Sequence, residues 1–164
     1  MIRIGYSKDI HRLKSGKRLN LGGIEIDSPY ETIAHSDGDV LLHAISEALL
    51  GALALRDLGY HFPDTLTATK DLASTTILTT VYDMILKKGY QLTNIDSMVL
   101  LEKPKLSPHI DAMRHRVAAL LKTDINTISI KATTFEGLGD GGNHQAIEAH
   151  ATVLLQKNPT IKKL

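Results

Sequence analysis

A short polar segment followed directly by an apolar helical pattern is the feature that most constrains the fold of this chain. Residues 35–43, with the sequence HSDGDVLLH, contain two histidines, two acids, a serine and a glycine. Asp39 is well suited as an N-cap, because its carboxylate can accept from the free N–H groups of a first helical turn. Apolar residues then recur at helical spacing, which predicts a helix over about 39–55 with His43 on its first exposed turn. The segment is therefore predicted to be a helix entrance that can face a phosphate and bind a metal ion.

Strand-like and helix-like patterns alternate along the rest of the chain. Leu19–Leu21 and Ile24–Ile26 flank Gly22-Gly23, which predicts a hairpin with a two-residue turn. The segments 29–32 and 137–142 are expected to be loops. Other strands are expected at about 2–6, 95–101, 128–132 and 146–155, and further helices over about 71–88 and from Ser107 onward. Strands mixed with three helices indicate a compact α/β or α+β domain.

Composition limits the classes of function. The length of 164 residues is enough for one domain with a substantial core, so a single domain over 1–164 is expected, with a disordered tail after about residue 157. A net charge of +1 gives no reason to expect nucleic acid as a partner. Cysteine is absent, so any metal must be bound by histidines and carboxylates. Without a long apolar run or a signal-peptide pattern, a cytoplasmic protein that makes no membrane contact is the expectation.

One set of residues could bind a metal ion. Asp9 and His11 are two apart, so an extended backbone would point both side chains the same way. Together with His43 they suit a tetrahedral zinc ion that keeps one position open. The alternative is a surface acid near two hydrogen-bonded histidines. Glu47, four residues after His43, could orient that imidazole or make an ordinary contact on the helix surface.

Two other places could bind a phosphorylated ligand. His35 and Ser36 precede the predicted helix, although a loop before a helix also favours serine for capping alone. Thr133 and Thr134 could offer hydroxyls to phosphate oxygens, and Glu136 could offer a carboxylate to a divalent ion. The alternative there is strand propensity for the threonines and a solvated glutamate.

Eight short blocks of sequence occur in order from residue 2 to about residue 155, which is nearly the whole chain. The blocks are DIH at 9–11, HSDGDVLLH at 35–43, LGA at 50–52, DLG at 57–59, FPDT at 62–65, KGY at 88–90, PKLSPH at 104–109 and KATTFE at 131–136. Taken together, they resemble the 2-C-methyl-D-erythritol 2,4-cyclodiphosphate synthases.

The resemblance implies a fold, an assembly and a reaction. The expected fold is a single domain with a mostly four-stranded mixed sheet, helices on one face and a small hairpin. The sheets of three copies would meet around the axis of a homotrimer, with active sites between neighbouring subunits. The substrate would be 4-diphosphocytidyl-2-C-methyl-D-erythritol 2-phosphate, whose 2-phosphate attacks the β-phosphorus and releases CMP. The product would be a cyclic diphosphate of the non-mevalonate isoprenoid pathway, which makes the enzyme a phosphorus–oxygen lyase.

The resemblance also implies a role for each matching residue. Zinc would be bound by Asp9, His11 and His43, and magnesium or manganese by Glu136. His35 and Thr134 would stabilise the transition state. The methylerythritol phosphate would contact Ser36, Asp57, Gly59, Phe62, Pro63, Asp64 and Thr65. The cytidine pocket would be formed by Pro104, Lys105, Leu106, Ala132 and Thr133.

The chain departs from the family pattern at positions that are not themselves implied metal ligands. Lys8 stands where the family usually has an aromatic residue, and Asn143 and Gln145 stand in place of an arginine and a glutamate. In the family these positions contribute to a cavity on the trimer axis that can hold isoprenoid diphosphates, so this chain is expected to differ there. Two alternatives to the synthase remain open from the residues: a non-catalytic trimer that binds a nucleotide or isoprenoid, and a zinc hydrolase.

Overall fold

The computed structural model describes residues 1–34, 36–63 and 72–158. Within these ranges, no helix has the length and apolar character needed to cross a membrane. The segment after about residue 157 that was predicted to be disordered lies almost wholly outside the described residues.

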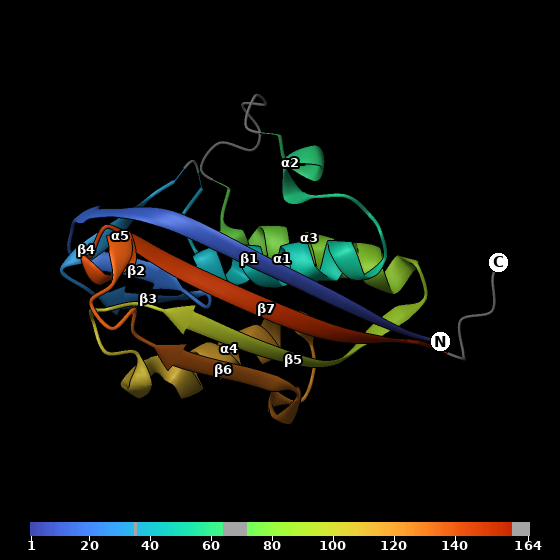
Figure 1. Cartoon of the computed structure of the whole chain (residues 1–164). Coiled ribbons are helices and arrows are strands. Elements are labelled where there is room, and N and C mark those ends of the chain that lie inside the picture. Colours follow the sequence, from blue (N-terminus) through green and yellow to red (C-terminus); the bar gives the residue numbers. More distant parts are fainter. Residues whose placement is uncertain (35, 64–71, 159–164) are drawn as a thin grey trace.

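A five-stranded mixed sheet forms one layer of the protein (Figure 1). Only β5 and β6 pair in parallel, and the other neighbouring strands are antiparallel. In spatial order the strands are β4 (Tyr30–Ile33), β1 (Ile2–Ser15), β7 (Ala146–Lys157), β5 (Tyr90–Leu100) and β6 (Ile128–Thr133). A separate hairpin consists of β2 (Arg18–Leu21) and β3 (Ile24–Asp27) and confirms the predicted turn at Gly22-Gly23.

The helices cover one face of this sheet, and the hydrophobic core lies between the two layers. The long ones are α1 (Val40–Ala52), α3 (Ser74–Lys87) and α4 (Ile110–Leu121). The short ones are α2 (Leu58–His61), α5 (Gly139–Gly142) and two 3₁₀ turns, η2 (Ser107–His109) and η3 (Ile125–Thr127). The mixed α/β class, with helices on one face and a small hairpin, is as predicted.

Helix α1 lies directly against β1 and β7. Asp39 caps it as predicted, because its side chain accepts a hydrogen bond from the N–H of Leu42 at 3.0 Å. The close approach requires Gly5 in β1, since a Cβ atom there would lie 1.9 Å from the carbonyl oxygen of Ala48. Helix α1 therefore packs closely against the face of β1 that points into the molecule.

The structure differs from the sequence-based expectation at β4. Residues 29–32 were predicted to be a loop, yet Tyr30–Ile33 pair with the second half of β1 and form the fifth strand. Its residues are half-buried or, at Ile33, exposed, so it lacks the alternation of buried apolar residues that predicts a strand. β1 also continues beyond residue 6, to Ser15, because it pairs with β7 as far as Arg12 and with β4 from Arg12 to Ser15. The segment 137–142, also predicted to be a loop, contains the single turn α5.

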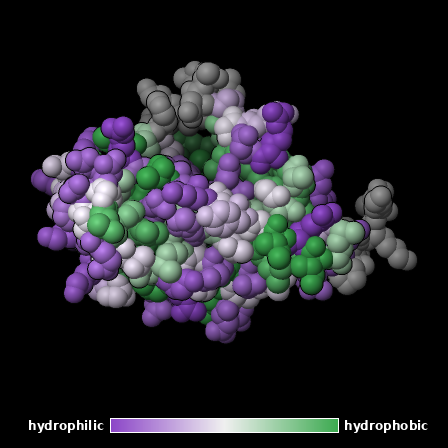
Figure 2. Space-filling model, viewed as in Figure 1, coloured by the Kyte–Doolittle hydropathy of each residue, from purple (hydrophilic) through white to green (hydrophobic). Residues whose placement is uncertain are grey.

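The sheet face opposite the helices is open to solvent and carries apolar side chains. Ile2, Ile4 and Tyr6 of β1 are 63%, 68% and 63% exposed. Figure 2 shows green hydrophobic side chains among purple hydrophilic ones on the side where the strands lie in front of the helices. Clustered exposed apolar residues on a strand are typical of an interaction surface.

Candidate metal centre and active site

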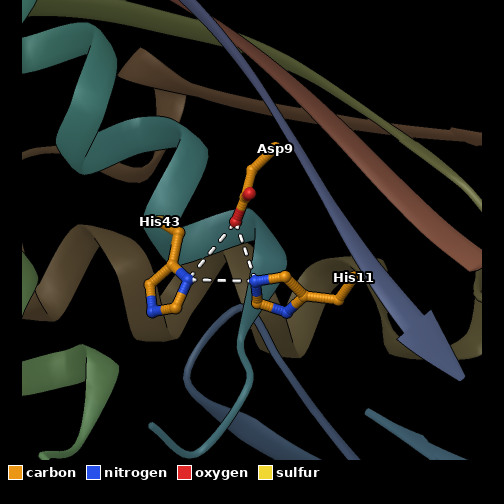
Figure 3. A group of neighbouring side chains, drawn as sticks. All are labelled: Asp9, His11 and His43. Atoms are coloured by element: carbon orange, nitrogen blue, oxygen red, sulfur yellow. Dashed lines mark hydrogen bonds and ion pairs between the residues drawn. The ribbon is translucent and has the colours of Figure 1, made fainter. Parts of the chain in front are cut away.

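Three potential metal ligands meet between β1 and α1 (Figure 3). Asp9 and His11 point to the same face of β1, and His43 comes from the first turn of α1. Asp9 Oδ2 lies 3.1 Å from His11 Nε2 and 3.3 Å from His43 Nδ1, and the two nitrogens are 3.4 Å apart. Each residue therefore directs one ligand atom to a common point, which is the arrangement that the sequence predicted for a metal site.

The environment favours a cation at this point. Burial alone would raise the pKa of Asp9, but the adjacent imidazoles of His11 and His43 outweigh it and lower the pKa far below its usual range. Asp9 Oδ2 is buried and, among the described residues, accepts no well-directed hydrogen bond, although both imidazole nitrogens are close. A buried carboxylate oxygen without a directed donor is costly, and a bound cation would satisfy it. The donor set of two imidazoles and one carboxylate fits zinc.

The main chain fixes the orientation of His11. Its Nδ1 lies 3.0 Å from the carbonyl oxygen of Gly38, which can only accept a hydrogen bond. Nδ1 therefore carries the proton of the neutral imidazole, and Nε2 presents a lone pair to the cluster. Burial lowers the pKa of His11, but the adjacent carboxylate of Asp9 outweighs that effect and raises it.

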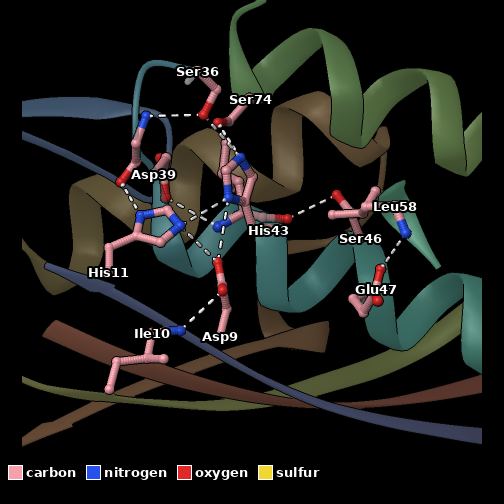
Figure 4. Close-up of polar contacts among 12 residues, drawn as sticks. Asp9, Ile10, His11, Ser36, Asp39, His43, Ser46, Glu47, Leu58 and Ser74 are labelled. Atoms are coloured by element: carbon pink, nitrogen blue, oxygen red, sulfur yellow. Dashed lines mark hydrogen bonds and ion pairs between the residues drawn. The ribbon is translucent and has the colours of Figure 1, made fainter. Parts of the chain in front are cut away.

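The second nitrogen of His43 faces two serines (Figure 4). Its Nε2 lies 2.9 Å from Ser74 Oγ and 3.3 Å from Ser36 Oγ. Ser74 in turn bonds to Asp37 through both its hydroxyl and its backbone N–H. Glu47 takes neither of its expected roles, because its carboxylate accepts from the backbone N–H of Leu58 at 2.7 Å and so holds the start of α2.

A cavity of about 440 Å³ opens beside the three ligands. Of the residues implied to contact the methylerythritol phosphate, Ser36, Gly59 and Phe62 line it, but Asp57 does not. The Asp57 side chain instead accepts from the backbone N–H of Tyr60 at 2.8 Å and caps α2. Pro63 follows Phe62 but does not line the cavity. His35, Asp64 and Thr65 lie outside the described residues.

A second cavity, of about 310 Å³, lies between the end of β6 and the segment before α4. Its lining includes most of the residues implied for the cytidine pocket, namely Lys105, Leu106, Ala132 and Thr133, together with Thr134. Pro104 is adjacent in sequence but does not line it. The structure thus gathers these residues at one end of the sheet.

Glu136 lies on a tight turn beside this second cavity. Its carboxylate accepts from the hydroxyl of Thr134 at 2.6 Å, and its backbone has a left-handed φ of +54°. Glu102, which the sequence did not single out, accepts from the backbone N–H groups of Phe135 at 2.8 Å and Gly137 at 3.3 Å. Glu102 therefore holds the turn on both sides of Glu136.

Among the described residues of one chain, the triad of Asp9, His11 and His43 does not come together with Glu136 and the second cavity. Among the described residues, the one cluster of potential metal ligands consists of Asp9, His11 and His43, without Glu136. Glu136 and the second cavity are instead built around the ends of β5 and β6.

Comparison with known proteins gives consistent matches over almost the full chain. The sequence profile of the YgbB family matches residues 2–156. The 2-C-methyl-D-erythritol 2,4-cyclodiphosphate synthase of Syntrophomonas wolfei is 47% identical over 95% of this chain and 99% of its own length. The synthase of Shouchella clausii is 49% identical over 96% of this chain and 99% of its own length.

Solved structures agree with the sequence matches. A structure of 2C-methyl-D-erythritol-2,4-cyclodiphosphate synthase superimposes with a TM-score of 0.88 and 38% identity, covering 94% of this chain and 100% of that one. A Plasmodium falciparum protein in complex with CDP superimposes with a TM-score of 0.85 and 36% identity, covering 96% and 97%.

Proposed function

The chain belongs to the YgbB family, whose matching relatives are 2-C-methyl-D-erythritol 2,4-cyclodiphosphate synthases, and on this premise we propose that it catalyses the same cyclisation. In that reaction an oxygen of the substrate's 2-phosphate bonds to the β-phosphorus. The bond between this phosphorus and the oxygen of the cytidylate breaks, and CMP leaves with the electron pair. The enzyme is then a phosphorus–oxygen lyase, and we propose the cytoplasm as its location.

The geometry of Asp9, His11 and His43 is the observation that supports this proposal most directly. These residues would hold zinc, since their ligand atoms converge and Asp9 Oδ2 lacks a directed donor. Glu136 would hold magnesium or manganese, because hard divalent ions prefer carboxylate oxygens. When bound, the two ions supply Lewis acidity to the crowded phosphate oxygens.

The residues of the chain would mainly orient the substrate. The nucleophile is already a phosphate anion, so the reaction needs alignment and charge stabilisation more than a strong base. Ser36, Gly59 and Phe62 border the cavity beside the triad and would contact the methylerythritol phosphate. Asp57, Pro63, Asp64 and Thr65 belong to the same proposed contact region. Thr134 and His35 would stabilise the developing charge on the phosphates.

The second cavity would bind the cytidine. A related protein was solved in complex with CDP, and the lining residues Lys105, Leu106, Ala132 and Thr133 match the family pattern. The lysine could offset phosphate charge, and the apolar residues could pack against the base. Pro104 would complete this pocket.

We also propose that three copies assemble with the exposed sheet face toward a common axis. Burying Ile2, Ile4 and Tyr6 would remove apolar surface from water. An assembly of this kind would also bring Glu136 of one subunit to the triad of its neighbour, which one chain alone does not do. On this face Lys8 is paired with Glu148 at 3.0 Å, so its charge is neutralised within the chain. We therefore expect the axis to differ from that of relatives that have an aromatic residue there.

The test is a single-turnover assay with purified protein, zinc, Mg²⁺ and the diphosphocytidyl substrate. The synthase is expected to release one CMP per cyclic diphosphate formed. A non-catalytic binder would bind CDP in calorimetry and leave the substrate unconverted. A zinc hydrolase would place ¹⁸O from labelled water in the product, which cyclisation does not. Absence of CMP from a folded, zinc-loaded oligomer would refute the proposed function.

A further inference from the structure

We propose that Asp37 and Ser74 form a positioning pair that fixes the tautomer of His43 and thereby raises the affinity of the Asp9–His11–His43 site for Zn²⁺. The inference rests on the proposed function, because it treats the three residues as a metal site. Asp37 and Ser74 are 37 residues apart in sequence and come together at the start of α3.

The contacts around Ser74 form a short chain of hydrogen bonds, of which Figure 4 shows the contact with His43. Ser74 is the first residue of α3 and is completely buried. Its backbone N–H donates to Asp37 Oδ2 at 3.1 Å, and its hydroxyl donates to Asp37 Oδ1. Its Oγ also lies 2.9 Å from His43 Nε2. The side chain is thus held on one side by a carboxylate and contacts the imidazole on the other.

The number of available protons sets the direction of these bonds. A serine hydroxyl has one proton, and an ionised carboxylate can only accept. The Ser74 proton is therefore directed to Asp37, so Ser74 Oγ can only accept from His43. Nε2 of His43 must then carry the single proton of the neutral imidazole, and Nδ1 is left as a lone pair that faces Asp9 and His11.

The same segment fixes both histidines of the site. Gly38 accepts from His11 Nδ1, and the neighbouring Asp37 acts on His43 through Ser74. In its neutral form, each imidazole therefore directs its unprotonated nitrogen toward the cluster. Outer partners of this kind typically change metal affinity by about 10–100-fold.

Two substitutions separate the roles of the pair. Ser74→Ala keeps the backbone bond to Asp37 but removes the nearer of the two serine oxygens that face His43 Nε2. Asp37→Asn places a side-chain amide against Ser74, and the amide can donate to Ser74 Oγ. The hydroxyl proton of Ser74 can then point toward His43 Nε2, which favours the His43 tautomer with its proton on Nδ1. Asp37→Asn is therefore expected to weaken Zn²⁺ binding at least as much as Ser74→Ala does.

Ser46→Ala is the matched control. Ser46 is also completely buried and lies one turn after His43 on the same helix, but its hydroxyl donates to the carbonyl of Leu42 at 2.7 Å. Removing this hydroxyl tests the effect of losing a buried serine beside the site without altering a partner of the imidazole.

The experiment measures Zn²⁺ affinity by competition with a chromophoric chelator, and the ¹⁵N shifts of the histidine rings in the metal-free protein. We expect the Nε2–H tautomer of His43 in the wild type. We expect the zinc dissociation constant to rise about 10–100-fold in Ser74→Ala and Asp37→Asn, and to change little in Ser46→Ala. Thermal unfolding identifies any variant that has lost its fold, and the wild-type ring shifts test the tautomer independently of every variant.

The outcomes separate this inference from the proposed function. Unchanged zinc affinity in both folded variants, or an Nδ1–H tautomer in the wild type, overturns the positioning role alone. A wild-type protein that binds no Zn²⁺ overturns the proposed metal site and, with it, the effect of the pair on affinity. Equal losses in Ser46→Ala and Ser74→Ala would attribute the effect to packing and also overturn the inference.

Discussion

The carbonyl oxygen of Gly38 lies 3.0 Å from Nδ1 of His11, and this contact depends on a backbone conformation that favours glycine. Gly38 has a left-handed φ of +75°. A Cβ atom at this position would lie 1.9 Å from Oγ1 of Thr32 on β4. The segment that orients His11 is therefore held by both its own backbone and the edge strand beside it.

Gly38→Ala is expected to lower both stability and zinc affinity. The left-handed conformation alone costs a non-glycine residue about 1–2 kcal/mol, and the overlap with Thr32 adds to it. Gly139→Ala is the control, because Gly139 also has a positive φ of +64° but a Cβ there would contact nothing within 4 Å. Denaturant unfolding should show a larger loss for Gly38→Ala. Equal losses would mean that contact with Thr32 is unimportant.

His43→Ala is expected to remove bound zinc and reduce CMP release at least about 100-fold, because Lewis-acid stabilisation is worth several kcal/mol. The variant should remain folded, since His43 is only partly buried. Its loss removes a polar ligand atom and no packed apolar side chain. Elemental analysis, circular dichroism and the CMP assay measure the three properties. His115→Ala, at an exposed position on α4, should leave all three unchanged. Normal turnover by His43→Ala would disprove the ligand assignment.

Glu136→Gln is expected to raise the Mg²⁺ concentration needed for half-maximal rate by on the order of tenfold, because an amide is a weaker ligand for a hard divalent ion than a carboxylate. Bound zinc should stay constant, since Glu136 is not part of the triad cluster. A titration of rate against Mg²⁺ at fixed zinc measures the shift. Loss of zinc from this variant would contradict the proposed division of the two metal sites.

Glu102→Ala is expected to lower turnover by on the order of tenfold without loss of zinc, because displaced reacting groups lose alignment. The substitution leaves the N–H groups of Phe135 and Gly137 without their acceptor, so the turn that carries Glu136 loosens. Glu102→Gln retains one side-chain oxygen that can accept both bonds and should restore most of the rate. If the alanine and glutamine variants are equally slow, charge and not hydrogen bonding is the property that matters.

Local patterns in the sequence were sufficient for much of the fold and for the geometry of the triad. Strand alternation correctly places Asp9 and His11 on one face, and the N-cap at Asp39 places His43 on the first turn of α1. The hairpin and the alternating burial of β7 follow from equally local signals. Each of these features depends on residues that are close together in sequence, so each can be predicted from its own segment alone.

Partners from distant segments could not be predicted in this way. Ser74 reaches His43 across 31 residues, and Glu102 reaches the turn at Phe135 across 33. The sequence predicts that Glu47 orients His43 or makes an ordinary helix-surface contact, yet its carboxylate accepts from the backbone N–H of Leu58 at the start of α2. The edge strand β4 is held by backbone pairing with β1, and its four residues show no alternation of buried and exposed positions that would predict a strand. Each of these contacts depends on the tertiary fold.

The pH dependence of stability provides a last test, at Glu47. The pKa of this carboxyl is raised above 4.5, mainly by burial. The negative charges of Asp57 and Asp9 raise the pKa further, and the hydrogen bond from the N–H of Leu58 lowers it in part. The folded chain therefore holds the proton more tightly than the unfolded chain does. As the pH falls from the pKa of the folded state to 4.5, protonation of Glu47 should increase the free energy of unfolding. Above the pKa of the folded state, the buried negative charge of Glu47 should lower the free energy of unfolding.

Glu47→Gln removes this titration but keeps an oxygen that can accept from Leu58. Around neutral pH the metal-free variant should unfold at the same or a higher denaturant concentration than the wild type. Its advantage should shrink as the pH falls toward 4.5, because the wild-type carboxyl becomes protonated there. Asp83→Asn removes an exposed carboxylate on α3 and should not reproduce this trend. An advantage of Glu47→Gln that grows on acidification would show that the folded protein favours the charged carboxylate, opposite to the effect expected from its burial.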